Sequence, residues 1–512
     1  MNLYSYHIFY FPFRWSMPSS ADRILSEQMD LMQIPIADYS MWERVQLDAT
    51  QSKAQLSEQE LKDARELFGE RQYFFDFVHP VLYDIKGVKN PLIHHYERRE
   101  PKNEEVSYQI QVRDKLYSLR VDAMNLNLYS TGVGILSFFM ANEREDQSKE
   151  DAVLAINQFG RRIMPPHSGE FNPESRSLIA SSIKILGLHD ATGRYEDCFD
   201  YEEQASENKR GLNNVWEPAR FIKSLIEDLS PDIDVIPIID DRMLVNCWYG
   251  NNELSKQVVD HAVNEKDEFV KGNFWYKYVF VDAGDKLEDE TCQNDPMKIQ
   301  LLKNATYFRW QKLGTLYGVS RYSFVALTNA EWFGVNILSM HMRTIYSRLF
   351  ELIIVQRASM LRFSAEVTKV SGLAGTSQRE VARRVGSLYK EYIRFVNQIY
   401  FRSVTLEDQG IELYDMLMNQ FASQDQIKDL DGEIDELHRY VMLLVDESRN
   451  ENGEMLNKLA AIFLPATVIT GILGMNKFCE LEARGDFWIH TGIIVLITIM
   501  AYSIINNKIR RK

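Results

Sequence analysis

The stretch FLPATVITGILGMN, residues 463–476, lies close to the C-terminal end of the chain. It belongs to an uncharged run from Leu459 to Met475, and a second uncharged run follows from Phe487 to Ile505. A helix needs about 20 apolar residues to cross a bilayer. The sequence therefore predicts two membrane spans, at 458–476 and 487–505. Two buried core helices are the alternative.

The flanking charges predict the orientation of these spans. The short segment between them, 477–486, carries charges of both signs, whereas the tail 506–512 is strongly basic. Because basic segments stay in the cytoplasm, we expect both termini inside and only 477–486 outside. This corresponds to a multi-pass protein of the inner (cell) membrane.

One face of the first span is small and polar. Steps of 100° per residue bring six residues to within about 60° of Leu464. We call this set, Leu464 included, the polar stripe: Asn450, Gly453, Asn457, Ala460, Leu464, Thr467 and Gly471. It suits either tight helix packing through small residues or a pore lined by each subunit. In a pore, Leu464 would be a hydrophobic gate.

The end of the first span offers a neutral oxygen ligand. Gly474 and Met475 lead to Asn476, which would sit at the outer mouth of the pore. Mg²⁺ loses its water reluctantly, so amide oxygens could hold the hydrated ion weakly enough to release it. A ring of Asn476 side chains would then contact the metal through its waters.

The region before the spans reads as long helices. Residues 335–404 predict two cytoplasmic helices that pack on a stalk at 405–457. Apolar residues of the stalk follow coiled-coil spacing with one phase shift between Phe421 and Ile427. Residues 405–457 hold fourteen acidic and three basic residues, and residues 341–403 hold eleven basic and four acidic residues. The two regions can pack together, and the acidic stalk can also attract cations.

Residues 1–334 read as a cytoplasmic α/β domain. Its predicted helix is EPARFIKSLIEDL, residues 217–229. The predicted strands are the N-terminal MNLYSYHIFYFPFRWS, QYFFDFV (72–78), VSYQIQV (106–112), GVGILSFFM (132–140), DVIPII (234–239), FWYKYVFV (274–281) and SRYSFVALT (320–328).

The C-terminal motifs resemble the CorA family of divalent-cation transporters. The match is Phe-x-Pro at 463–465, Thr467, Gly471 and the signature Gly-Met-Asn at 474–476. The resemblance implies a homopentamer with a funnel-shaped cytoplasmic domain, a long stalk helix and a pore on the five-fold axis. It assigns the selectivity filter to Gly474, Met475 and Asn476. Five residues of the polar stripe match the family's pore-lining positions: Asn450, Gly453, Leu464, Thr467 and Gly471. The sequence departs from the family at Leu473, at Arg439 and in the loop KFCELEARGD (477–486).

The predicted function is transport of a divalent cation, Mg²⁺ first, gated by the cytoplasmic domain. We expect that the protein is not an enzyme and that it needs no cofactor. The size and architecture of the domain also resemble CorA-like membrane effectors associated with type III CRISPR systems, which implies an alternative: a pore in antiviral defence that a nucleotide second messenger opens. Expected partners are the chain itself, the bilayer and that nucleotide. The net charge of −15 argues against direct nucleic-acid binding.

Four weaker patterns in the first 334 residues left a functional and a structural reading open. We expect a solvated loop at His79, His94 and His95, and an exposed acidic turn at Asp282, Asp285, Glu288 and Asp289 rather than a metal site. Asp240 and Asp241 end a strand, where carboxylates serve either catalysis or turns. Arg161, Arg162 and His167 suit a phosphate contact or a surface loop.

Overall fold

The computed structural model describes residues 2–17, 31–48, 67–100, 105–161, 180–189, 195–198, 218–239, 242–264, 273–282, 291–372 and 378–473, with residues 492 and 496. The chain divides into two compact units. The first comprises Met1–Lys369 and Ser387–Ile434, and the second comprises Val370–Gly386 and Asp435–Lys512.

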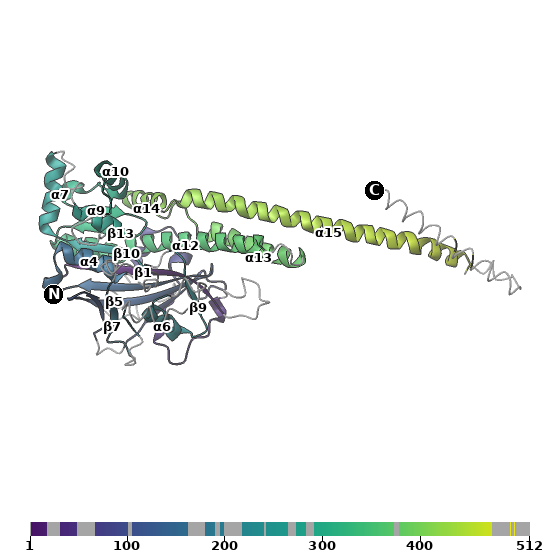
Figure 1. The fold of residues 1–512 in the computed structure, drawn as a ribbon, viewed down its shortest axis with the longest axis horizontal. Helices are drawn as coiled ribbons and strands as arrows, with labels where there is room; N and C mark the ends of the chain where they lie inside the picture. The colour runs from purple at the N-terminus through teal and green to yellow at the C-terminus, as the bar shows by residue number, and fades with distance from the viewer. Residues whose placement is uncertain are drawn as a thin grey trace. The chain divides into compact units, whose positions relative to one another are not determined.

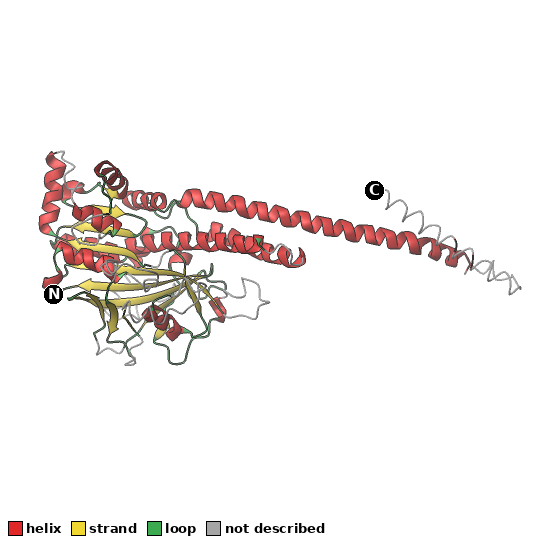
Figure 2. Cartoon of the chain, in the orientation of Figure 1, coloured by secondary structure: helices red, strands yellow, loops and turns green. Residues whose placement is uncertain are grey.

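One large sheet forms the centre of the first unit (Figures 1 and 2). Its strands run in the order β11-β12-β13-β10-β1-β6-β5-β4-β7-β8, while β3 joins β5, β2 joins β3 and β9 joins β1. Among the described strands only β10 and β13 pair in parallel. The strands are β1 (Ser5–Ser16), β2 (Trp42–Arg44), β3 (Ile93–Arg98), β4 (Ser107–Val112), β5 (Lys115–Tyr129), β6 (Val133–Asn142), β7 (Ser182–Leu186), β8 (Glu196–Cys198), β9 (Asp234–Pro237), β10 (Leu244–Gly250), β11 (Thr306–Tyr307), β12 (Leu316–Val319) and β13 (Ser323–Thr328).

The described helices follow β1 and lie between and after the other strands. They are α3 (His79–Leu82), α4 (Glu150–Gly160), α6 (Arg220–Leu229), α7 (Asn252–Asn264), α9 (Asn273–Phe280), α10 (Asp295–Ala305), α11 (Ser339–Arg343), α12 (Ile345–Ser371), α13 (Gln378–Gln398), α14 (Asp408–Gln420) and α15 (Ser423–Leu473). A π-helix, η6 (Gly334–Leu338), leads into α11. Short 3₁₀ turns are η1 (Leu31–Gln33), η3 (Glu145–Gln147) and η5 (Gln311–Leu313).

The central strand β1 is buried on both faces, and alternation along it gives each face a different partner. Phe9 and Phe11 belong to the main hydrophobic core, which includes residues of α4 and α6. Tyr10 points to the other face, where its hydroxyl lies 2.8 Å from the Ser347 hydroxyl of α12. Strand β1 is therefore sandwiched between the main core and α12.

Helix α12 follows the sheet over much of its length. Near its start, the ring of Phe350 packs edge-on against Tyr10 at 5.7 Å. Further along, the Ser359 hydroxyl donates to the Thr131 hydroxyl at 2.9 Å, and Arg362 donates to the Thr131 carbonyl at 2.6 Å. Thr131 lies in the turn between β5 and β6, so α12 contacts the middle of β1 and also the turn at the end of these two neighbouring strands.

Helix α14 is held to α12 and to the loop that precedes it. Gln356 of α12 donates at 3.1 Å both to the Ile399 carbonyl and to the Tyr414 hydroxyl of α14. The Tyr414 hydroxyl donates in turn to the Phe401 carbonyl at 2.7 Å. This buried set of polar contacts fixes the start of the stalk region against the first unit.

The stalk is two helices rather than one. Helix α14 ends at Gln420, Ala422 takes a left-handed backbone conformation with φ 50°, and α15 begins at Ser423. A left-handed residue cannot continue a right-handed helix. The break coincides with the phase shift between Phe421 and Ile427, so the predicted stalk region 405–457 contains α14 and the first part of α15.

The second unit contains the end of α12, the first part of α13 and most of α15. Val370, Val385 and Val441 form a small buried cluster there, with Val381 and Leu437 packed against it. From Asp435 onward α15 carries large exposed apolar side chains: Tyr440, Met442, Leu443, Met455, Leu456 and Leu459.

Most of the predicted strands occur, but two do not. Strands cover the predicted segments at the N-terminus and at 106–112, 132–140, 234–239 and 320–328, and helix α6 covers most of 217–229. The segment 274–281 is instead helix α9, which buries Trp275, Tyr276, Tyr278 and Val279. The segment 72–78 is the end of a helix followed by turns.

Candidate cation pathway and the α12 network

The polar stripe lies within one uninterrupted helix, α15. Helical periodicity therefore keeps its residues on one face. Asn450, Asn457, Ala460 and Thr467 are exposed on the single chain, and Gly453 is half-buried with open space where a Cβ would lie. Polar and small side chains on this face are thus available to other subunits or to ions.

The rest of the predicted pathway is only partly covered. The side chains of Leu464 and Gly471 lie outside the described residues, as do Gly474, Met475, Asn476 and most of the second predicted span. In the described part of the chain, no helix combines the length and apolarity that a bilayer crossing requires. The two spans stay a prediction.

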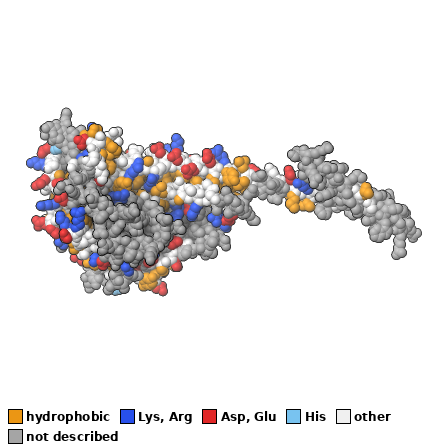
Figure 3. Space-filling view, in the orientation of Figure 1, with side chains coloured by type: hydrophobic (Ala, Val, Ile, Leu, Met, Phe, Trp, Pro, Cys, Tyr) orange, Lys and Arg blue, Asp and Glu red, His pale blue; other side chains and the backbone are white. Residues whose placement is uncertain are grey.

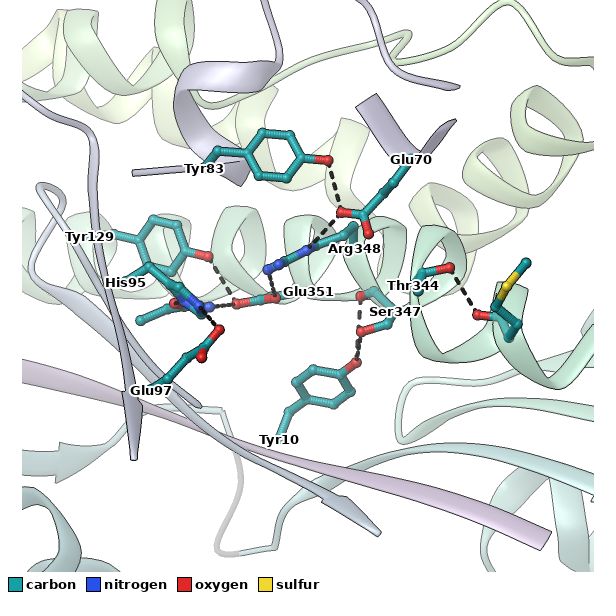
Figure 4. A network of polar contacts seen from close by, with 12 residues as sticks. Tyr10, Glu70, Tyr83, His95, Glu97, Tyr129, Thr344, Ser347, Arg348 and Glu351 are labelled. Atoms are coloured by element: carbon teal, nitrogen blue, oxygen red, sulfur yellow. Dashed lines mark hydrogen bonds and ion pairs between the residues drawn. The ribbon is translucent and has the colours of Figure 1, made fainter. Parts of the chain in front are cut away.

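A set of polar residues joins the start of α12 to the sheet (Figure 4). We call it the α12 network; it comprises Tyr10, Glu70, Tyr83, His95, Glu97, Asn127, Tyr129, Ser347, Arg348 and Glu351. At its centre, the Arg348 guanidinium lies 3.3 Å from Glu70 and 3.5 Å from Glu351. One cation therefore links two carboxylates that are nearly buried.

Glu351 connects this ion pair to the strands. It accepts hydrogen bonds from the Asn127 amide and, at 3.1 Å, from the Tyr129 hydroxyl, both on β5. Asn127 also contacts His95 of β3 at 2.5 Å, and His95 contacts Glu97 at 3.3 Å. A continuous polar chain thus runs from α12 across two adjacent strands.

Burial and neighbouring charges set the ionisation of this network. Burial opposes the charge of Arg348, but Glu70 and Glu351 outweigh it and raise the pKa of Arg348. Burial, reinforced by Glu351, raises the pKa of Tyr129 well above its usual value. The hydrogen bond from His95 lowers the pKa of Glu97. Tyr129 and Arg348 therefore each keep one protonation state over the physiological pH range.

A second group of contacts ties α14 to the edge of the sheet. Glu412 of α14 accepts from the Tyr307 hydroxyl and, at 2.8 Å, from Arg309. Trp310 donates to Gln409 at 2.9 Å. The hydrogen bonds from Tyr307 and Arg309 lower the pKa of Glu412. The sheet thus contacts both α12 and the helix that directly precedes α15.

Charges are mixed on the face of the molecule drawn in Figure 3, where basic and acidic side chains are interspersed over the first unit. Among the described residues no group of three or more His, Cys, Asp or Glu could hold a metal ion.

Comparison with known proteins bears on the C-terminal part of the chain. Residues 348–511 match the family model described as CorA-like Mg²⁺ transporter protein. This region is CorA-like. No curated protein and no solved structure matches the chain. The CorA-like region begins at Arg348, the central residue of the α12 network, and covers about a third of the chain.

The weaker predicted sites lie in several environments. His79, His94 and His95 are buried, so the solvated loop is wrong: His94 and His95 lie in β3. Arg161 is also buried, next to the end of α4, with its guanidinium over the Tyr322 ring. Asp282 accepts from Thr291 at 3.0 Å. The other residues of these weaker sites lie outside the described residues; they are Arg162, His167, Asp240, Asp241, Asp285, Glu288 and Asp289.

The α12 network itself could not be predicted from the sequence. Its central contacts join residues that are 278 and 224 positions apart, Arg348 to Glu70 and Asn127 to Glu351. The adjacent histidines were the only local signal. In a strand, neighbouring side chains point to opposite faces, so His94 and His95 could not have formed one site.

Proposed function

We propose that this chain forms a CorA-like membrane channel or transporter that moves divalent cations, with Mg²⁺ as the first candidate. The match of residues 348–511 to the CorA-like Mg²⁺ transporter model is the observation that carries the proposal. Since that family consists of transporters, the proposed activity is not enzymatic. Mg²⁺ is then the cargo rather than a resident cofactor.

The proposed assembly is a homopentamer in the inner membrane. CorA-like proteins are typically homo-oligomeric, and exposed apolar side chains on α15 such as Leu443 and Leu456 favour contacts with further copies. The two uncharged runs would span the bilayer, with both termini in the cytoplasm. Five copies of the polar stripe would line the pathway, Leu464 would close it, and the Gly-Met-Asn at 474–476 would select the ion.

Gating would start in the first unit. The α12 network and the Tyr307–Glu412 contacts attach α12 and α14 to the same sheet. A shift of that sheet would therefore act on both helices that lead to α15. Such packed elements switch between discrete arrangements rather than deform gradually.

The second candidate function keeps the pore and changes its control. In this reading a nucleotide second messenger opens a type III CRISPR-associated membrane effector in antiviral defence. What favours it is size: residues 1–347 lie outside the family match and make up most of the first unit. A cation transporter does not need this domain for the chemistry of ion selection.

The test is Mg²⁺ flux into proteoliposomes that contain the full chain. The parent should conduct, Asn476→Ala should lose most of the flux, and Ile469→Ala, on the opposite face of the helix from the polar stripe, should retain it. Equal flux in all three variants would remove the selectivity role of Asn476. No flux until a nucleotide extract is added would favour the effector function over the transporter.

A further inference from the structure

A cavity of about 310 Å³ opens between α12 and the end of β1. Its walls come from three segments: Arg14 of β1, residues 236–239 at and after β9, and Leu361, Arg362 and Ala365 of α12. Most of the lining is apolar, from Ile236, Pro237, Ile238, Ile239, Leu361 and Ala365, while Arg14 and Arg362 are the charged residues. Such a mixture is typical of a small-molecule site.

Arg362 brings a buried guanidinium to this cavity. It is 1% exposed, and two of its nitrogens are occupied: one donates to the Thr131 carbonyl at 2.6 Å and one to Glu391 at 3.0 Å. Its Nε has no hydrogen-bond partner in the described part of the chain. A buried donor without a partner costs free energy, which a bound acceptor would recover.

Arg14 is the second guanidinium, and it is largely unused. Its contact is an ion pair with Glu366 at 3.8 Å, longer than a charge-assisted hydrogen bond of about 2.8 Å. Glu366 is shared, because Lys369 approaches it to 3.3 Å. Among the described residues that line the cavity, the charged ones are both arginines, Arg14 and Arg362. Their carboxylate partners, Glu366 and Glu391, are not among the lining residues.

We propose that this cavity binds a small organic anion, with an oxyanion head between Arg14 and Arg362 and an apolar body against residues 236–239. The shared chemistry is a carboxylate or a phosphate monoester on a short apolar group. Guanidinium groups bind both heads through paired hydrogen bonds. Because the cavity joins β1 to α12, its occupant bridges the sheet and the first helix of the CorA-like region. The binding itself does not rest on the transport activity.

Calorimetric titration of the full, detergent-solubilised chain tests the site. The probes are butyl phosphate, hexanoate, inorganic phosphate and butylammonium. The anions with an apolar body should bind, and inorganic phosphate should bind at least about tenfold more weakly, because it lacks several buried methylene groups. Butylammonium, which reverses the head charge, should not bind. A preference between butyl phosphate and hexanoate identifies the head group.

Arg14→Gln is the variant, because Arg362 holds the turn at Thr131 and its loss could unfold the unit. Arg14→Gln should weaken binding roughly tenfold or more, the effect of one charge-assisted hydrogen bond. Ile236→Glu should do the same by adding a negative charge to the half-exposed wall. Arg144→Gln is the matched control. Arg14 pairs with Val133 at the start of β6, whereas Arg144 is an exposed arginine just after the end of that strand, where it pairs with Asp146. This variant should bind like the parent.

Three results would overturn the proposal. They are the absence of binding by both butyl phosphate and hexanoate, unchanged affinity in Arg14→Gln, and binding of butylammonium as tight as that of the anions. Melting temperatures of each variant without ligand separate lost binding from lost folding. Ile236→Glu keeps the test valid if Arg14→Gln does not fold.

Discussion

The polar residues of the α12 network and those of the polar stripe of α15 differ in burial and in their partners within the chain. In the network, Glu351 is 4% exposed and takes partners from α12 and β5. On α15, Asn450 and Asn457 are exposed. The first set is satisfied inside one chain, whereas the second is open to whatever surrounds the helix. Polar residues of the network support the fold, and those of the stripe are available for assembly and ion passage.

This difference predicts opposite responses to mutation. Removal of a partner inside the network leaves a buried charge without its ion-pair partner, so the stability of the fold should decrease. Removal of Asn450 or Asn457 leaves no group without its partner in the described part of the chain, so stability should hold while transport changes. A variant that reverses this order would break the comparison.

The largest expected effect is that of Glu351→Ala. Arg348 would keep Glu70 but lose its second carboxylate, and Asn127 and Tyr129 would lose their acceptor. Breaking a buried ion pair costs on the order of 3–5 kcal/mol. The melting temperature of the detergent-solubilised chain measures it.

Asp146→Ala is the control for Glu351→Ala, since it removes the exposed partner of Arg144. Exposed pairs contribute little, so its melting temperature should match the parent. Similar melting temperatures for both variants would mean that the network does not hold α12 to the sheet.

The next effect is the pH dependence of stability that comes from His7, a buried histidine of the first unit outside the network. Burial lowers the pKa of His7 to about 4, although its hydrogen bond with Asn157 opposes that shift. The unfolded chain therefore binds this proton more readily than the folded one. The stability from neutral His7 is complete above pH 6.5 and is lost as the pH falls toward 4, by up to about 3 kcal/mol.

Melting temperatures of His7→Gln between pH 7.5 and 4 check this sign. The variant should lose less stability over that range than the parent does. His189→Gln, which changes an exposed histidine, should follow the parent curve. Parallel curves for His7→Gln and the parent would contradict the cause given for the shift.

A smaller effect is expected on the stripe, in Asn450→Ala. A contact between a hydrated ion and an amide contributes about 1.5 kcal/mol, or roughly tenfold in rate. Mg²⁺ flux should fall by that factor with no change in melting temperature. Leu459→Ala alters the opposite face of the helix and should conduct like the parent. A lower melting temperature without loss of flux would give Asn450 a structural role.

The smallest effect should come from Gly453→Ala. Open space surrounds this position, and alanine favours a helix over glycine by about 1 kcal/mol. The single chain should become slightly more stable, yet five added methyl groups would narrow the proposed pathway and lower flux. Gly386→Ala in α13 also has open space and should raise stability without a change in flux. A gain in both properties for Gly453→Ala would exclude it from the pathway.

The sequence predicted elements whose pattern is local. The N-terminal segment predicted as a strand is β1, and the phase shift near Phe421 coincides with the left-handed backbone of Ala422. The segment 274–281 was misassigned because its aromatic residues suit a strand by composition, whereas helix α9 buries them on several sides. The α12 network and the cavity at Arg14 depend on contacts between distant segments, which no local pattern encodes. The sequence can place the residues of the polar stripe on one face because this needs only helical periodicity, which α15 supplies; that they line a pore stays a prediction.

The most direct test of the central claim is cysteine modification at two neighbouring positions of α15. Asn457→Cys lies on the polar stripe, and Met455→Cys lies on the opposite face at 100° per residue. Both side chains are exposed. If the stripe lines a cation pathway, a charged thiol reagent should block Mg²⁺ flux through Asn457→Cys and leave Met455→Cys and the parent unchanged. Equal block at both positions, or block only at Met455→Cys, would contradict the account.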